Sequence, residues 1–190
     1  MLQQCRKAWG NEISYAEIVE KAEKAPDLNV FIDVDMEEFY APDNMALAVA
    51  NAVDRDFNVK VDWLDIGAIA KICYESLALK YRYFTEKILD AADKRIYRIY
   101  IVGGGSKNKL LNQYTANATG YSVCTGVAEG SSVANILLQA YGAGEVKDKK
   151  EMRQIICNTF ETHTFEPKDT DLWIKKYHIF EARISHKAQY

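Results

Sequence analysis

The feature that most constrains this chain is a run of three glycines between a strand-like and a helix-like segment. Ile99-Tyr100-Ile101-Val102 is apolar and β-favouring, and Gly103, Gly104 and Gly105 follow it directly. A segment with helical spacing then runs to Gly120. The chain has only ten glycines. Three in succession at such a junction indicate either a tight turn or a place where another molecule approaches the backbone closely.

The flanking segments predict alternating helices and strands. We expect a helix over 62–94, a strand over 97–102, a helix over 106–118 that ends at Gly120, and a strand over 121–125. Residues 28–34 read as a strand or an extended segment. The remaining helices are expected over 2–9, 14–24, 43–55, the stretch from 131 to 142 or 144, 148–159 and 169–183. This order is typical of α/β layering.

The longest predicted helix, 62–94, carries one apolar stripe. Its apolar residues run from Ile66 through Leu77 and Phe84 to Ile88 at spacings of three, four or seven. These spacings place them on one face of a helix, so we expect the whole stripe to be buried.

Several helix starts carry capping signals. Ser14, with Glu17 three residues later, predicts a capping box. Ser131 or Ser132 is expected to cap the helix that follows the strand 121–125. Pro42 is expected in the first turn of the helix 43–55.

The predicted sheet is too small for the number of helices. Only two or three strands are visible, so we expect either missing strands or a partner that supplies them. An exposed sheet edge could also pair with a second copy and give a homodimer. The first residues, "LQQCRKAW", read as the middle of a helix, which suggests a piece of a longer protein.

Composition excludes several classes of function. The chain has 190 residues and a net charge of −3, without a basic tract, so nucleic acid is not an expected partner. It has no signal peptide and no apolar run of membrane-spanning length, so we expect a cytoplasmic protein without a membrane partner. Its four cysteines form no CxxC and its histidines no H-x-x-x-H. We therefore expect no bound metal held by these residues.

Two common phosphate-binding patterns fail at the glycine run. The fingerprint G-x-G-x-x-G matches Gly103 and Gly105, but Asn108 stands in place of the third glycine. A Walker A motif fails because no G-K-[ST] follows. On spacing alone, a turn without a ligand and a nucleotide site remain about equally supported. Three consecutive glycines are more than a turn needs, and this favours the nucleotide site.

Longer segments carry a family resemblance. "IVGGGSKNKLLNQYTANATG" (101–120) and "AEGSSVANILLQ" (128–139) resemble the nucleotide-binding part of FGGY carbohydrate kinases, in particular the rhamnulokinase subfamily. "FIDVDMEEFYAPDNM" (31–45) and "YESLALKYRYFTEKI" (74–88) extend the likeness collinearly. The resemblance implies an α/β fold of the actin-like, ribonuclease-H-like ATPase class, helix-rich and lacking its first strands. Residues 1–190 would then be a C-terminal domain, without the sugar-binding domain, catalytic aspartate and phosphate hairpin that lie upstream in the family.

The resemblance also implies a reaction and a site. Mg-ATP would phosphorylate a ketose, L-rhamnulose being favoured, on its primary hydroxyl. Gly103, Gly104 and Gly105 would line the adenosine, and Asn108 would reach the adenine. Asp43 would lie near the nucleotide and Asp35 near the sugar. The family usually has an amide residue where Asp35 stands in this chain. No catalytic residue is assigned within this chain, which alone is expected to be inactive.

Two alternatives stay open. The chain could be a non-catalytic actin-like module that binds nucleotide or assembles with a partner, or part of a kinase for another ketose or a polyol. Gly130 and Ala134 also depart from the family pattern E-A-[ST]-x-x-G-N, and we expect these small replacements to preserve the local structure.

Overall fold

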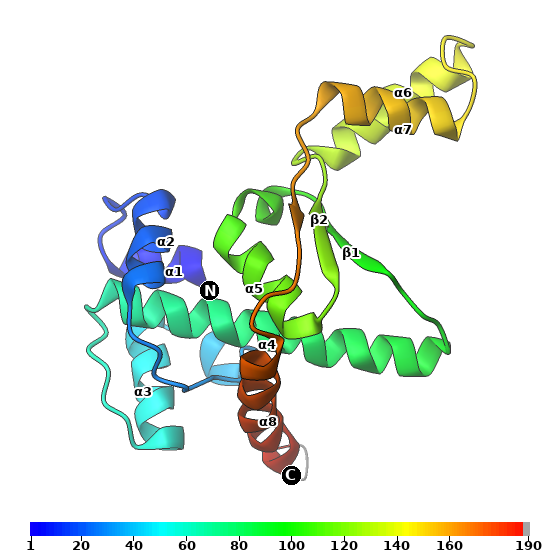
Figure 1. Ribbon diagram of the computed structural model, residues 1–190. Coiled ribbons are helices and arrows are strands. Elements are labelled where there is room, and N and C mark those ends of the chain that lie inside the picture. Colours follow the sequence, from blue (N-terminus) through cyan, green and yellow to red (C-terminus); the bar gives the residue numbers. More distant parts are fainter. Residues whose placement is uncertain (188–190) are drawn as a thin grey trace.

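The long helix α4 (Ile66–Ala92) crosses the molecule, and the other elements are arranged around it (Figure 1). The computed structural model describes residues 1–187. Along the chain it contains α1 (Leu2–Ala8), α2 (Tyr15–Lys24), η1 (Glu37–Phe39), α3 (Met45–Phe57), α4, β1 (Arg98–Ile101), η2 (Gly104–Lys107), α5 (Lys109–Thr119), β2 (Ser122–Thr125), α6 (Gly130–Gly142), α7 (Lys149–Thr159), β3 (Thr164–Phe165) and α8 (Thr170–Lys187). The predicted α/β order is therefore confirmed, with three strands in the described part.

The N-terminal helices form the best-packed part of the molecule. Cys5 of α1, Val49 and Val53 of α3, and Ile69 and Cys73 of α4 are fully buried in one apolar cluster. The predicted capping box of α2 is confirmed, since the Glu17 N–H donates to Ser14 Oγ and the Ser14 N–H donates to the Glu17 carboxylate. Local signals and burial agree in this region.

Residues 28–34 join no sheet, so the strand alternative for this segment was wrong. The Ile32 N–H donates to Ser76 Oγ on α4 at 3.0 Å instead of to a strand. Phe31 is buried with residues of α4 and α8. The prediction for Pro42 was wrong, because the side chain of Asn44 caps α3 and the helix begins after it.

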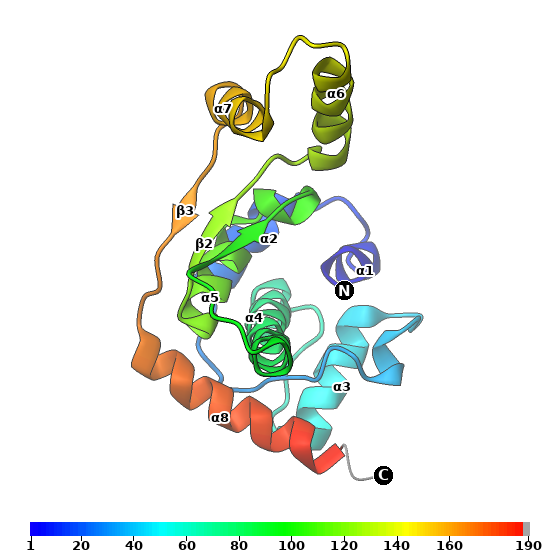
Figure 2. The ribbon, with the colours of Figure 1, turned by 90° about the vertical axis from the view of Figure 1, so that its right-hand side faces the viewer.

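The sheet has the order β1-β2-β3. Strands β1 and β2 are parallel, with Ile99 opposite Val123, and β3 runs antiparallel to β2. Helix α5 connects the parallel pair and contacts β2, β3 and α4 (Figure 2). This strand–helix–strand unit places the glycine run at the carboxyl end of β1, beside the start of α5.

Strand β1 is bare on one side. Within the described residues its only sheet partner is β2, so its other edge is unpaired. Tyr100 is 65% exposed, and Val102, just beyond the strand, is 63% exposed. Strand β2, which has neighbours on both edges, is almost wholly buried.

Helix α8 is tied to the rest of the fold by a buried ion pair. Lys176 Nζ lies 2.7 Å from Glu75 Oε1 on α4 and 2.7 Å from Asp27 Oδ2 in the segment after α2. The Lys176 and Glu75 side chains are buried. Burial raises the pKa of Glu75, and the nearby Lys176 ammonium opposes this rise.

Helices α6 and α7 project beyond the sheet as an arm, residues 130–159 (Figures 1 and 2). The predicted serine cap was wrong: Glu129 is the N-cap residue and Gly130 begins the helix, so Ser131 and Ser132 lie inside its first turn. On α6 only Leu137 is buried, whereas Ile136 is 66% exposed. The reason is that the arm extends away from the body that would cover it.

The single buried stripe predicted for α4 was also partly wrong. All buried residues of this helix lie between Gly67 and Lys80. Phe84 and Ile88 are 46% and 64% exposed, because only another side of the later turns, with Tyr83 and Glu86, meets α8 in the described chain. Among all the residues that the structure describes, no helix is both long enough and apolar enough to cross a membrane.

Candidate functional site

Only one of the three glycines is required by the backbone. Gly103 has φ = +78°, a conformation that side chains other than glycine rarely adopt. Gly104 and Gly105 lie outside that region of φ and begin η2. A Cβ atom on Gly104 would meet nothing within 4 Å, and one on Gly105 would meet only Ile101 Cγ2 at 3.8 Å. The protein itself therefore has room for side chains at both positions.

Two polar residues hold the glycine run in place. Ser106 Oγ donates to the Gly103 carbonyl at 2.6 Å, and Asn112 Nδ2 of α5 donates to the Ser106 carbonyl at 2.9 Å. Asn112 is fully buried, and its Oδ1 has no hydrogen-bond partner. Sequence reasoning missed Asn112 because it considered only the apolar residues of this helix face.

A hollow of about 890 Å³ lies beside Gly104 and Gly105, within the usual size range of ligand pockets. We call it the glycine-loop hollow. Apolar side chains of α1, α2, α4 and α5 contribute much of its wall, together with the three tyrosines Tyr15, Tyr74 and Tyr81. Its remaining polar side chains are Lys107, Asn108 and Lys109. This combination suits a flat ring that also carries negative charge.

The tyrosines were not predicted as site residues. Tyr74 and Tyr81 are seven residues apart on α4, so they lie on one face of the helix, with Leu77 between them. Periodicity alone assigned this face to the core. Tyr15, at the start of α2, reaches the hollow only through the tertiary arrangement of α2 and α4.

Asn108 lines the hollow and caps α5. Its Oδ1 accepts the N–H of Leu111 at 3.0 Å. Burial raises the pKa of the Tyr74 phenol, and a hydrogen bond from the Asn108 side chain opposes this rise. The carboxamide oxygen of Asn108 is therefore engaged at the start of α5.

Gly103 faces a second, smaller hollow. This hollow, of about 430 Å³, is lined by Val102, Gly103 and the residues that begin α6, including Glu129 and Gly130. The glycine run thus separates two hollows, and only Gly104 and Gly105 border the one with the tyrosines.

The two aspartates that the resemblance assigned are not among the described residues that line the glycine-loop hollow. Asp43 is exposed in the loop before α3. Asp35 lies 3.0 Å from Lys80 Nζ, which is also 2.6 Å from Asp33, and the Asp35 side chain is 58% exposed. The structure therefore brings Gly104, Gly105 and Asn108 together and places the two aspartates elsewhere.

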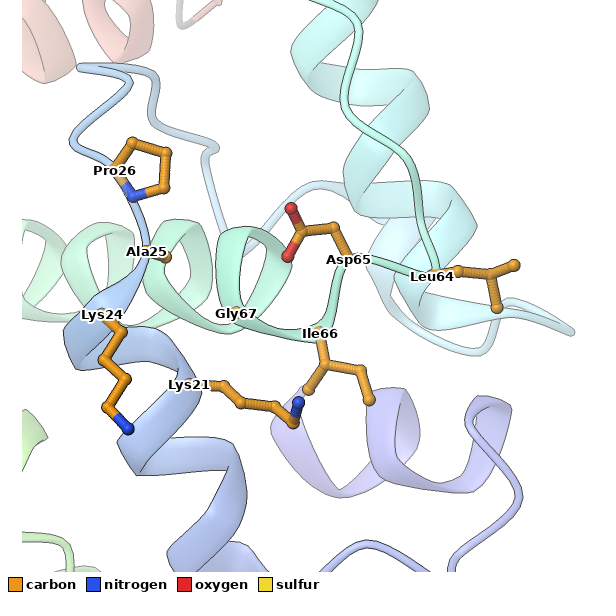
Figure 3. Close-up of a pocket in the computed structure, with 8 residues that line it drawn as sticks. All are labelled: Lys21, Lys24, Ala25, Pro26, Leu64, Asp65, Ile66 and Gly67. Atoms are coloured by element: carbon orange, nitrogen blue, oxygen red, sulfur yellow. The ribbon is translucent and has the colours of Figure 1, made fainter.

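A further hollow, of about 350 Å³, lies where α2 ends against the start of α4 (Figure 3). Lys21 and Lys24 project from α2, and Asp65 and Ile66 lie across from them. Asp65 caps α4 by accepting the Ala68 N–H at 3.0 Å. Because Asp65, the only carboxylate among the described lining residues, already caps a helix, this hollow is best explained as a junction between helices.

Among the described residues, no group of three or more His, Cys, Asp or Glu side chains is placed to hold a metal ion. Mg²⁺ usually binds one or two carboxylates together with substrate phosphates, so such a cage is not needed for it to act with ATP.

Residues 1–143 match the FGGY family of carbohydrate kinases, C-terminal domain. Rhamnulokinase of Bacteroides thetaiotaomicron is 33% identical over 181 residues, which cover 95% of this chain and 37% of that protein. Rhamnulokinase of Enterococcus faecalis is 34% identical over 188 residues, covering 97% of this chain and 38% of that protein. The chain therefore spans little more than a third of the length of these relatives.

Solved structures share the fold. Xylulose kinase from Rhodospirillum rubrum matches with a TM-score of 0.64 at 14% identity, covering 97% of this chain and 36% of that one. Gluconate kinase from Lactobacillus acidophilus matches with a TM-score of 0.63 at 16% identity, covering 94% of this chain and 36% of that one. The expected fold class, that of the FGGY sugar kinases with their actin-like ATPase architecture, is confirmed.

Proposed function

This chain belongs to the FGGY family of carbohydrate kinases, and on that premise we propose that it is the nucleotide-binding side of an ATP-dependent sugar kinase. The observation that carries the proposal is the glycine-loop hollow. Gly104 and Gly105 border it without any steric need for glycine in the protein itself. Their missing side chains leave the space open to a ligand.

The shape and chemistry of the hollow support an adenosine moiety. Tyr15, Tyr74 and Tyr81 offer aromatic and apolar surface to a flat base. Lys107 and Lys109 place two cations at the same hollow, where a triphosphate would need them. Asn108 supplies a polar contact that could orient the base.

The proposed sugar is L-rhamnulose, phosphorylated on its primary hydroxyl. The support is the identity of 32–34% with rhamnulokinases of three bacteria, over 90% or more of this chain. The xylulose and gluconate kinases are 14–16% identical and inform only on the fold. A kinase acting on another ketose or a polyol is the alternative, because sugar choice belongs to the part of the relatives that this chain does not match.

The proposed reaction is in-line transfer of the γ-phosphoryl group to the sugar hydroxyl, with Mg²⁺ carried by the phosphates. Gly104, Gly105 and Asn108 would position the base, and an aspartate outside this chain would accept the hydroxyl proton. Asp43 would lie toward the nucleotide and Asp35 toward the sugar. Asp35 is paired with Lys80 yet more than half exposed, so its carboxylate remains accessible.

The proposal also includes a cytoplasmic location and self-association. The unpaired edge of β1 and the exposed Tyr100 and Val102 favour pairing with a second copy. Sedimentation velocity of the 190-residue chain tests this, and a monomer at all concentrations would contradict it. A stable dimer that binds no nucleotide would favour an assembly module over a kinase.

Calorimetric titration of the chain with ATP tests the nucleotide site. We expect Gly104→Leu to weaken binding at least about tenfold, because the new side chain projects into the hollow. Gly142→Leu is the matched control, since a Cβ there also meets nothing within 4 Å and the residue lies on the arm. Absence of ATP binding, or equal loss in both variants, would contradict the proposal. We also expect no sugar-dependent ADP release from this chain alone.

A further inference from the structure

The polar side chains around the glycine-loop hollow are mostly hydrogen-bond donors. The ammonium groups of Lys107 and Lys109 can only donate, and the three tyrosine hydroxyls can donate or accept. No aspartate or glutamate occurs among the described residues that line the hollow. A fixed side-chain acceptor could therefore come only from Asn108.

The oxygen of Asn108 is already engaged. Oδ1 accepts the Leu111 N–H at 3.0 Å and so faces the first turn of α5. The amide nitrogen is the end of the carboxamide that the cap does not use, and Asn108 lines the hollow. Turning the carboxamide over to present its oxygen would remove the cap of α5. The geometry thus presents Asn108 to the hollow as a donor.

Adenine and guanine differ in the group that such a site would read. Adenine carries an exocyclic amino donor where guanine carries a carbonyl acceptor, and both have the acceptor N7. Strong discrimination arises when a rejected ligand leaves a buried polar group of the site unpaired. A donor from Asn108 can be satisfied by either purine, and the tyrosine hydroxyls can adapt to both.

We propose that the glycine-loop hollow binds purine nucleoside triphosphates with little discrimination between adenine and guanine, because the cap of α5 fixes Asn108 as a donor. This inference rests on the proposed function, since it concerns the same hollow. Asn108 then determines which bases the hollow tolerates, because its oxygen is held by the cap of α5.

Competitive binding of ATP and GTP to the full 190-residue chain tests the proposal. We expect dissociation constants that differ by less than about tenfold. A preference of tenfold or more for either nucleotide would overturn the inference while leaving the nucleotide site intact. If neither nucleotide binds, the proposed function fails and the inference fails with it.

Asn108→Asp separates base recognition from capping. Aspartate caps helices as well as asparagine does, so α5 should persist, but the variant offers an acceptor in place of the donor. We expect the ratio of GTP to ATP dissociation constants to rise at least about fivefold, since the guanine carbonyl would face a carboxylate. An unchanged ratio would overturn the inference.

Asn44→Asp is the matched control. Asn44 caps α3 in the same way, with Oδ1 accepting the Leu47 N–H at 2.9 Å, and it does not line the hollow. The control should leave the GTP to ATP ratio unchanged. A similar change in both variants would show that charge alone moves the ratio and would also overturn the inference.

Discussion

The two halves of α4 both carry apolar residues at helical spacing but have different surroundings. From Gly67 to Lys80 the helix is almost wholly buried, whereas none of its buried residues lies between Tyr81 and Ala92. Apolar residues at helical spacing continue through both halves, as Leu79 in the first and Ile88 in the second illustrate. Leu79 is fully buried and Ile88 is 64% exposed.

The difference teaches that periodicity identifies a face but not its neighbour. The buried half meets α2, α3, α5 and α8, which reach it from distant parts of the sequence. The second half keeps partial contacts, such as the Tyr177 hydroxyl of α8 that donates to Glu86 Oε2, but Phe84 and Ile88 on it are exposed. Substitutions along one helix should therefore have unequal effects.

The largest loss of stability is expected from Lys176→Met. The substitution leaves Glu75 buried without its cationic partner, which typically costs about 3–5 kcal/mol in the free energy of unfolding. Urea denaturation measures this loss. The double variant Lys176→Met/Glu75→Leu removes both charges and should recover most of it. A loss below about 1 kcal/mol in the single variant would show that the pair is not isolated from solvent.

The next effect compares the two halves directly. We expect Leu79→Ala to lower the free energy of unfolding by about 2–5 kcal/mol, because it leaves a cavity in a fully buried site. Ile88→Ala should change it by no more than about 0.5 kcal/mol, since that side chain is exposed. Equal losses measured by urea denaturation would mean that the second half is covered in solution, for example by a second copy.

A smaller effect is expected at the start of the buried half. A Cβ atom on Gly67 would lie 2.7 Å from the Lys21 carbonyl oxygen, so α2 and α4 must move apart in Gly67→Ala. Such overpacking typically costs about 1–3 kcal/mol. Gly142→Ala, where the added atom meets nothing within 4 Å, is the control for thermal unfolding. An unchanged melting temperature in Gly67→Ala would contradict the close approach.

The smallest expected effect is a pH dependence of folding stability that comes from Lys80, where the two halves of α4 meet. Burial alone would lower the pKa of Lys80, but hydrogen bonds and charge from Asp33 and Asp35 outweigh it and raise that pKa above its ordinary value of 10.5. A raised pKa in the folded state stabilises the protein fully below pH 10.5 and loses this contribution as pH rises through the folded value.

Chemical denaturation between pH 8 and pH 12 checks this prediction about Lys80. Lys80→Met should be less stable than the parent at the lower end and should lose less stability as the pH rises. Parallel curves for the two proteins would contradict the assigned role of Lys80.

Local signals predicted most of the elements. The capping box at Ser14 and the left-handed end of α5 at Gly120 depend on interactions within a few residues, so they can be recognised from the sequence. The start of α6 could not be placed in this way. Ser131 and Ser132 are good caps, yet Glu129 occupies that position, because the helix begins at Gly130, shortly after β2 ends at Thr125.

The candidate site likewise contains some residues that the sequence predicted and others that it did not. Gly104, Gly105 and Asn108 were predicted, and the structure places them at one hollow. Tyr15, Tyr74 and Tyr81 were not predicted, because their contribution depends on how α2 and α4 lie beside the glycine run. The roles of Asp35 and Asp43 remain predictions, and neither residue reaches that hollow among the described contacts.

The sequence by itself determined the α/β order, the strand-to-helix turn at Gly103 and the family. These follow from side-chain periodicity, from the conformational freedom of glycine and from motifs several residues long, all of which are local properties. Only the tertiary structure decided that one half of α4 is buried, that Lys176 meets Glu75, and that Gly104 and Gly105 open onto a hollow with three tyrosines. The physical reason is that burial depends on what lies opposite a residue, and that neighbour comes from a distant part of the chain.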